Sequence, residues 1–202
     1  MLLVGLTGSI GAGKSAVGRM LAARGAVVVD ADDLARRAVE PGTPGHARVV
    51  ERFGERILAP DGSIDRRALA AIVFADPVAR RDLEAIVHPE VLRMFAEEAA
   101  RHRGTDRVVV YVAPLLVETG HADAFDVLVV VSAPEERRIE RLVRDRGMTP
   151  EDVRARIAAQ LPAEEKARRA DVVVDNAGSL EELERRVDAL WGDLRARAGG
   201  RR

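Results

Sequence analysis

The chain has 202 residues, of which 47% are hydrophobic, 32% charged and only 3% aromatic, a composition typical of one compact globular domain. Its 32 basic and 33 acidic residues leave a net charge of −1, so we expect no general binding to nucleic acid or to a membrane surface. The absence of cysteine excludes disulfides and thiolate metal sites, and with no sign of a signal peptide or membrane span we expect a cytoplasmic protein.

The first recognisable element is a phosphate-binding P-loop. Residues 8–15 read Gly-Ser-Ile-Gly-Ala-Gly-Lys-Ser, after an apolar strand candidate (2–6) and before a helical pattern (16–24). The glycines allow tight turning, so that backbone N–H groups point into one nest for a polyphosphate. Lys14 is expected to bind the outer phosphates, and the Ser15 hydroxyl to bind Mg²⁺. The segment predicts nucleoside-triphosphate chemistry.

Four further apolar runs, rich in Val and without alternation, indicate strands buried on both faces: residues 26–29, 107–112, 127–131 and 171–174. Helical patterns separate them. The sequence therefore predicts a three-layer α/β/α P-loop fold with a five-stranded parallel sheet, and ligands bound at the carboxyl ends of its strands.

Two stretches exceed what a single crossover helix needs. The first, between Val29 and Val108, predicts a helical subdomain with helices at 32–39, 45–53, 65–74 and 76–101, the last with Asp76 as N-cap and Pro77 at its first position. The second, after Val131, predicts a helix from 135 to 146 ended by Gly147, and another from Thr149 to Leu161. A final helix is predicted from Ser179 to Arg197.

The second insertion carries many arginines. They are either a solvated helical face paired with neighbouring glutamates or, as a cluster, a lid that closes on phosphates. We favour the lid for the cluster and leave single arginines open. The residues concerned are Arg137, Arg138, Arg141, Arg144, Arg146, Arg154 and Arg156.

The reaction depends on what accompanies the P-loop. A GTPase would carry an Asn-Lys-x-Asp segment late in the chain, and none is present. Instead Asp30-Ala31-Asp32 follows the second strand, where a carboxylate can accept a proton from a hydroxyl that attacks the γ-phosphoryl group. The alternative is that these aspartates cap the next helix, and each interpretation can hold for a different member of the pair.

At this point a resemblance covers essentially the whole chain. The chain resembles the dephospho-CoA kinases in a series of segments with matching order and spacing, which begin at Gly5 (P-loop), Asp30, Val39, Phe53, Asp61, Arg66, His88, Pro114, Arg156, Ala170 and Asn176. The resemblance implies ATP-dependent phosphorylation of the ribose 3′-hydroxyl of dephospho-CoA, giving CoA and ADP in the last step of coenzyme A biosynthesis. It also implies Asp32 as the general base and Arg141 as a lid arginine that reaches the ATP phosphates.

The resemblance implies the domain limits too: a core (1–32, 104–132 and 164–202), a substrate-binding helical subdomain (33–103) and a lid (133–163). Asn176 and Gly178 lie where the family holds adenine, largely through backbone contacts. The roles of His88 and Glu118 stay open, because Glu118 either orients a basic partner or is structural. The residues predicted to bind ATP are Gly8, Gly11, Ala12, Gly13, Lys14, Ser15, Ala16, Asn176 and Gly178, with Ser15 on the metal.

Three positions depart from the family pattern. Ala16 replaces a common Thr, which matters little because its phosphate contact is a backbone N–H. Val112 stands where an acidic residue ends the third strand in some members, so Mg²⁺ must depend mainly on Ser15, phosphate oxygens and water. Ser9 replaces a common Gly and requires a negative φ.

Two rival functions remain: a nucleoside or nucleotide kinase, and a non-enzymatic protein whose P-loop senses ATP. Preference for dephospho-CoA over adenosine and AMP excludes the first, and ATP turnover that depends on an acceptor excludes the second. We expect a monomer or weak homo-oligomer.

Overall fold

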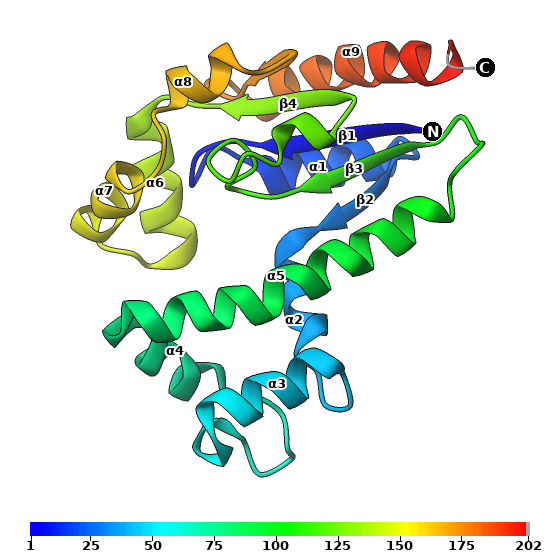
Figure 1. The fold of residues 1–202 in the computed structure, drawn as a ribbon. Coiled ribbons are helices and arrows are strands. Elements are labelled where there is room, and N and C mark those ends of the chain that lie inside the picture. Colours follow the sequence, from blue (N-terminus) through cyan, green and yellow to red (C-terminus); the bar gives the residue numbers. More distant parts are fainter. Residues whose placement is uncertain (201–202) are drawn as a thin grey trace. The chain divides into compact units, whose positions relative to one another are not determined.

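A computed structural model of the chain describes residues 1–200 (Figure 1). It contains all five predicted strands, each within one residue of its expected limits. The strands are β1 (Leu2–Thr7), β2 (Val27–Asp30), β3 (Val108–Val112), β4 (Val127–Ser132) and β5 (Val172–Asp175). The helices are α1 (Lys14–Ala23), α2 (Ala31–Ala38), α3 (Pro44–Phe53), α4 (Arg66–Ala75), α5 (Pro77–Ala100), α6 (Glu135–Arg146), α7 (Pro150–Ala158), α8 (Ala163–Arg168) and α9 (Leu180–Gly199).

The strands form one sheet in the order β2-β3-β1-β4-β5. The central strand β1 pairs in parallel with both β3 and β4, and β4 pairs in parallel with β5. Because parallel strands end at the same edge of a sheet, the P-loop after β1 lies at the same edge as the residues that follow β4 and β5.

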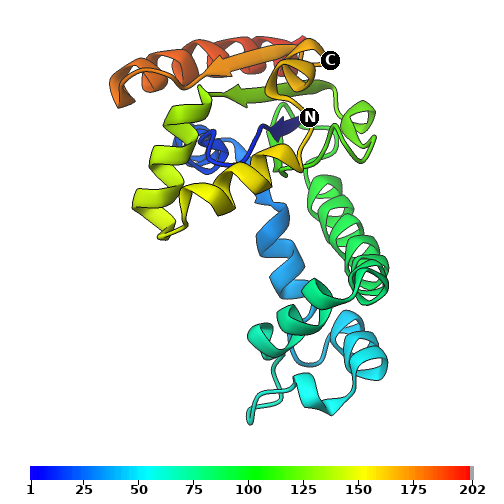
Figure 2. The same ribbon diagram turned by 90° about the vertical axis from the view of Figure 1, so that its left-hand side faces the viewer.

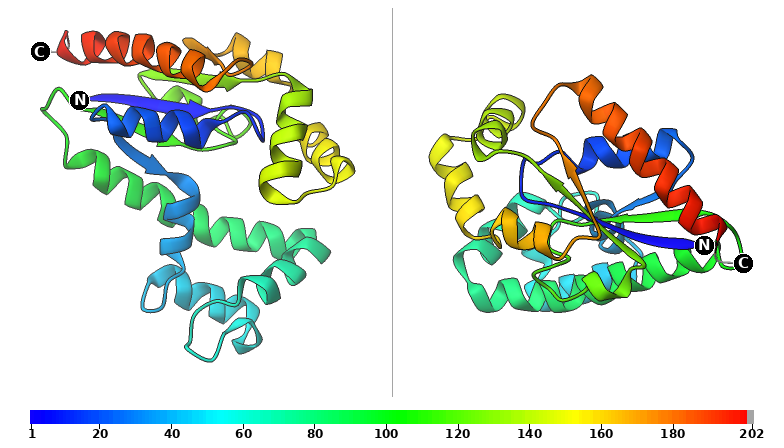
Figure 3. Two further views of the ribbon diagram at one scale, coloured as in Figure 1. Left: turned by 180° about the vertical axis from the view of Figure 1, so that it is seen from behind. Right: turned by 90° about the horizontal axis from the view of Figure 1, so that it is seen from above.

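Helices α1 and α9 cover one face of the sheet, where they also contact each other (Figure 3). Alternate strand residues such as Leu6, Val112 and Val129 point to this face and are buried there. Leu183, Val187, Leu190 and Leu194 of α9 complete the same core. These residues form one apolar stripe along α9, which runs to Gly199 rather than to the predicted Arg197.

On the other face, α8 lies against β4. The loop after β3 supplies Leu116 and Phe125, which fill the space left by Gly5, while Tyr111 stacks on Phe125 with ring centroids 5.7 Å apart. Helix α8 was not predicted, because its six residues follow Pro162 without an apolar periodicity.

The chain divides into two compact units, Asp30–Arg101 and the remainder. The first of these contains α2 to α5 around an apolar core of Val49, Phe53, Ile57, Leu69 and Ala79. All four helices begin at side-chain caps, since Asp30, Thr43, Asp65 and Asp76 each accept a hydrogen bond from a first-turn N–H. The predicted start of the long helix at Asp76-Pro77 is therefore confirmed.

In the other unit, α6 and α7 pack together after β4 (Figure 2). Gly147, with φ of 61°, ends α6 as predicted. Helix α7 ends at Ala158, so its predicted extent to Leu161 was wrong. Leu161 precedes Pro162, and the proline ring disfavours the helical conformation of the residue before it. The limits predicted for the lid (133–163) and the substrate-binding subdomain (33–103) stay predictions.

None of the helices within residues 1–200 has the length and apolar character that crossing a bilayer requires.

Candidate active site

The P-loop backbone turns tightly between β1 and α1. Gly8, Gly11 and Gly13 all have positive φ, whereas Ser9 does not, which meets the condition set by its side chain. A methyl group at Gly13 would overlap Nδ2 of Asn176, and one at Gly8 would overlap the Val131 carbonyl oxygen. At these two positions the close approach of neighbouring groups also requires glycine.

Lys14 begins α1 and folds back over the loop. Its Nζ donates hydrogen bonds to the carbonyl oxygens of Gly8 (2.8 Å) and Ser9 (3.3 Å). Ser15 is exposed in the first helical turn, and the Ala16 N–H donates to the Gly13 carbonyl at 3.0 Å. The helix has neither a side-chain N-cap nor an acidic residue in its first turn. Its positive end is therefore not neutralised by its own side chains and suits a bound anion.

Asn176 fastens the loop after β5 to the P-loop. Its side-chain Nδ2 donates to the Ala12 carbonyl at 2.8 Å, and its backbone N–H donates to the Ser132 carbonyl at 2.7 Å. The residue is only 7% exposed. The resemblance suggested backbone contacts with adenine at Asn176, whereas the structure gives its side chain a role in fixing the P-loop. Gly178 is exposed two residues further on.

Arg141 reaches the same place from α6. Its Nη2 donates to the backbone oxygen of Asn176 (3.0 Å) and lies 3.3 Å from Oδ1 of the same residue. The other terminal nitrogen, Nη1, is buried without a hydrogen-bond acceptor and lies 3.9 Å from where a Cβ of Gly13 would stand. A buried guanidinium N–H that lacks an acceptor, beside a P-loop glycine, favours a phosphate oxygen as its missing partner.

Other arginines of α6 and α7 have partners of their own. Arg144 Nε lies 2.6 Å from Asp145 Oδ1, and this hydrogen bond lowers the pKa of the Asp145 carboxyl. Exposed pairs also join Arg137 to Glu140 and Arg154 to Glu151. For these three arginines the structure agrees with the solvated-face interpretation.

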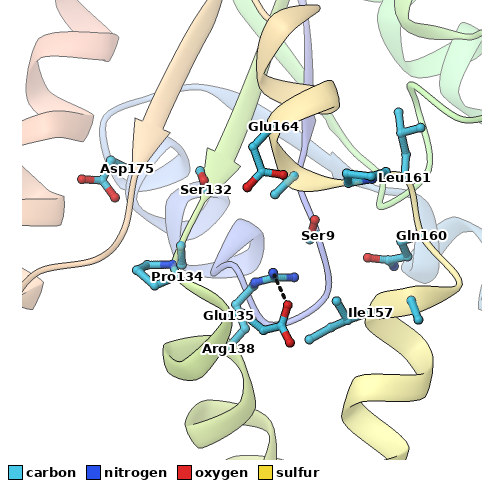
Figure 4. A pocket seen from close by; sticks show the side chains of 14 residues that line it. Ser9, Ser132, Pro134, Glu135, Arg138, Ile157, Gln160, Leu161, Glu164 and Asp175 are labelled. Carbon is cyan, nitrogen blue, oxygen red and sulfur yellow. Dashed lines mark ion pairs between the residues drawn. The ribbon is translucent and has the colours of Figure 1, made fainter.

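A cavity of about 560 Å³ lies beside the P-loop, between the ends of β4 and β5 and the segment from α6 to α8 (Figure 4). Arg138 lines it with a side chain that is 6% exposed, paired with Glu135 at 3.8 Å, and an Nε that has no acceptor. Gln160, on the opposite wall, accepts a hydrogen bond of 2.9 Å from the Ile10 N–H through its Oε1. Glu164 and Asp175 add carboxylates to the lining.

Of the two aspartates at the end of β2, one caps the next helix and the other is available for a different role. Asp30 is the N-cap of α2, because its Oδ1 accepts a hydrogen bond of 2.8 Å from the Asp32 N–H. Asp32 lies in the first turn, exposed, with its carboxylate outside the capping interaction. Both residues belong to the unit Asp30–Arg101, whereas the P-loop, Arg141, Asn176 and Gly178 belong to the other unit.

The structure thus brings together the P-loop, Arg141 and Asn176 out of the predicted residues. The side-chain contact of Asn176, the buried position of Arg138 and the contact of Gln160 with the P-loop were missed. For Gln160 the only signal in the sequence was its place in the family-matched segment that begins at Arg156 and reads Arg-Ile-Ala-Ala-Gln.

Comparison with known proteins identifies the family. The family model described as Dephospho-CoA kinase matches residues 2–182. A protein of Streptomyces avermitilis named Dephospho-CoA kinase is 54% identical over 198 residues, covering 98% of this chain and 96% of that protein. One of Thermobifida fusca with the same name is 50% identical over the full length of both chains. A crystal structure from Thermus thermophilus superimposes with a TM-score of 0.82 at 41% identity, covering 96% of this chain and 97% of the other. The chain therefore belongs to the dephospho-CoA kinase family.

Proposed function

We propose that the chain performs the reaction of its family with the donor phosphates held between the P-loop and Arg141. The reaction is the ATP-dependent phosphorylation of the ribose 3′-hydroxyl of dephospho-CoA, which gives CoA and ADP. The observation that carries the assignment of the donor site is the buried, unpartnered Nη1 of Arg141 beside Gly13. An ATP phosphate oxygen supplies the acceptor that this nitrogen lacks.

Lys14 and the loop amides neutralise the outer phosphates. With nucleotide bound, the Lys14 ammonium exchanges its contacts with the Gly8 and Ser9 carbonyls for phosphate oxygens. The amides at the start of α1 add the positive end of the helix, and together these groups stabilise the charge that develops during transfer. We assign these contacts to Gly8, Gly11, Ala12, Gly13, Lys14, Ser15 and Ala16.

Mg²⁺ fits this site as an ion held mainly by the nucleotide. The described residues contain no cluster of three acidic or histidine side chains that would bind a metal by themselves. The exposed Ser15 hydroxyl at the start of α1 is one suitable oxygen ligand, and Mg²⁺ commonly keeps several waters and phosphate oxygens. Mg²⁺ bound there supplies charge neutralisation across the phosphates.

Asp32 acts as the general base. Support comes from the division between the two aspartates, since Asp30 occupies the capping role and leaves the Asp32 carboxylate exposed. The ribose 3′-oxygen forms a bond to the γ-phosphorus, the bond to the bridging oxygen breaks, and ADP leaves. The hydroxyl proton passes to the Asp32 carboxylate.

The subdomain from 33 to 103 is proposed to bind dephospho-CoA, and the segment 133–163 to act as the lid. Asn176 and Gly178 are proposed to border the adenine of ATP. We further propose a cytoplasmic enzyme that works as a monomer or weak homo-oligomer without nucleic acid, in keeping with its near-neutral charge. Light scattering across a concentration series tests the oligomeric state.

The decisive experiment measures ADP release by a coupled assay with dephospho-CoA, adenosine or AMP as acceptor, each with Mg²⁺ and with EDTA. We expect turnover that requires dephospho-CoA and Mg²⁺, with little activity on the other acceptors. Equal turnover with adenosine or AMP contradicts the acceptor assignment. Release of ADP at the same rate without any acceptor contradicts the proposed transfer reaction.

A further inference from the structure

A buried ion pair joins the segment after the lid to the loop after β3. Lys166 of α8 is completely buried, with its Nζ 2.5 Å from Glu118 Oε1 and 3.3 Å from the Pro114 carbonyl oxygen to which it donates. The Glu118 side chain is 20% exposed. The sequence left open whether Glu118 orients a basic partner, and the structure supplies that partner in Lys166.

The same carboxylate oxygen has a second contact. The backbone N–H of Leu161 donates to Glu118 Oε1 at 3.4 Å. The preceding residue is Gln160, whose side-chain oxygen accepts from the P-loop Ile10 N–H at 2.9 Å. Hydrogen bonds and one peptide link therefore connect Lys166 and Glu118 to the P-loop.

Stability alone does not explain a charged pair at this place. Two well-packed apolar side chains of similar volume often stabilise a fold as well as a buried ion pair does. Apolar groups cannot, however, accept the Leu161 N–H or donate to the Pro114 carbonyl. The charged pair fixes the direction of these backbone groups and thereby the course of the segment that carries Gln160.

We propose that Glu118, whose buried charge Lys166 compensates, is a positioning residue that, through Leu161 and Gln160, holds the P-loop in its donor-binding conformation. Ile10 is the third residue of the P-loop octet and directly precedes the Gly11 to Ser15 backbone. An anchor on its N–H limits how far the loop can open. This inference rests on the proposed function, since it requires that the P-loop binds ATP.

The first test removes the hydrogen bond between Gln160 and the P-loop. Gln160→Met keeps the length of the side chain and loses the acceptor for the Ile10 N–H. We expect the KM for ATP and the Kd for ADP, measured by calorimetry, to rise about three- to tenfold, as for one lost hydrogen bond. The KM for dephospho-CoA should stay within about twofold.

The second test compares two double variants that both remove the buried charges. Glu118→Gln with Lys166→Met keeps a side-chain oxygen for the Leu161 N–H, whereas Glu118→Leu with Lys166→Met does not. Neither leaves an uncompensated charge, so both should fold. We expect the Gln/Met variant to retain the ADP affinity of the unsubstituted protein within about twofold, and the Leu/Met variant to lose about three- to tenfold.

Arg24→Met with Asp188→Leu is the matched control. This pair joins the end of α1 to α9 at 2.7 Å, at the opposite end of α1 from the P-loop. Its loss should lower Tm without changing either KM. Equal ADP affinities in the Gln/Met and Leu/Met variants, or unchanged ADP affinity in Gln160→Met, would overturn the proposal. An unsubstituted protein without acceptor-dependent ADP release would instead contradict the proposed function.

Discussion

Asn176 holds the carbonyl oxygen of Ala12 with its side-chain amide at 2.8 Å, across 164 positions of sequence. The same residue receives the Arg141 guanidinium on its backbone and side-chain oxygens. A single residue therefore contacts both the P-loop and Arg141 of α6. Because the amide has a donor and an acceptor side, neither aspartate nor leucine can replace it in both contacts.

We expect Asn176→Asp to weaken ATP binding although it is nearly isosteric. Its carboxylate keeps acceptors for Arg141 but cannot donate to the Ala12 carbonyl, and an unpaired buried acceptor costs about 1–3 kcal/mol. The KM for ATP should rise about tenfold, with a lower Tm. Asn176→Ala removes both side-chain contacts, to Ala12 and to Arg141, and should be at least as damaging. An Asp variant with the ATP KM of the unsubstituted protein would show that the Ala12 contact does not shape the donor site.

The fold was largely predictable because its signals are local. Apolar runs between helical patterns predicted the five strands, and the motif predicted the P-loop. The family resemblance is confirmed by the match to residues 2–182. Helix α8 escaped prediction because burial of Lys166 against Glu118, rather than an apolar stripe, holds it in place. The Asn176 contact could not be predicted either, since it depends on how the loop after β5 meets the P-loop at the edge of the sheet, across the intervening strand β4.

Arg141→Met should lower kcat/KM for ATP by about a hundredfold or more, because it removes the preorganised donor that we propose for the phosphates. Arg141→Lys should recover only part of this loss, since an ammonium cannot contact Asn176 and a phosphate in the same bidentate way. Arg185→Met, an exposed arginine of α9 in the same unit, controls for the loss of one positive charge. Similar kinetics for the Arg141 and Arg185 variants contradict the donor-site assignment.

Lys14→Met should reduce both ATP affinity and turnover, because its ammonium is expected to bind the outer phosphates in ground and transition states alike. Isothermal titration with ADP and with a non-hydrolysable ATP analogue measures the loss of affinity, and the coupled assay measures the loss of turnover. We expect the larger loss with the ATP analogue, since the lysine is proposed to bind the outer phosphates. Near-normal affinity and turnover would remove Lys14 from the phosphate cradle.

Asp32→Asn should lower kcat by about a hundredfold or more while the Kd for ATP changes less than about threefold. Asp30→Asn is a close control, because asparagine caps a helix about as well as aspartate and preserves the bond to the Asp32 N–H. We expect this control to keep its turnover and its Tm. If both variants lose turnover equally, the local negative charge rather than a base at Asp32 is responsible.

Gly13→Ala should cost far more activity than Gly25→Ala, although the two glycines have nearly the same φ of 103° and 102°. Both substitutions force an L residue into a disfavoured conformation, at about 1–2 kcal/mol each. At Gly25, beyond the end of α1, the added methyl meets only Trp191 Cζ2 at an ordinary 4.0 Å. At Gly13 it overlaps Nδ2 of Asn176, so the amide must leave the Ala12 carbonyl or the loop must move. We therefore expect both variants to lose similar Tm from backbone strain, with a further loss at Gly13, and only Gly13→Ala to raise the KM for ATP. Equal ATP kinetics in the two variants would mean that the Asn176 contact tolerates displacement and that the P-loop needs glycine at position 13 for its conformation alone.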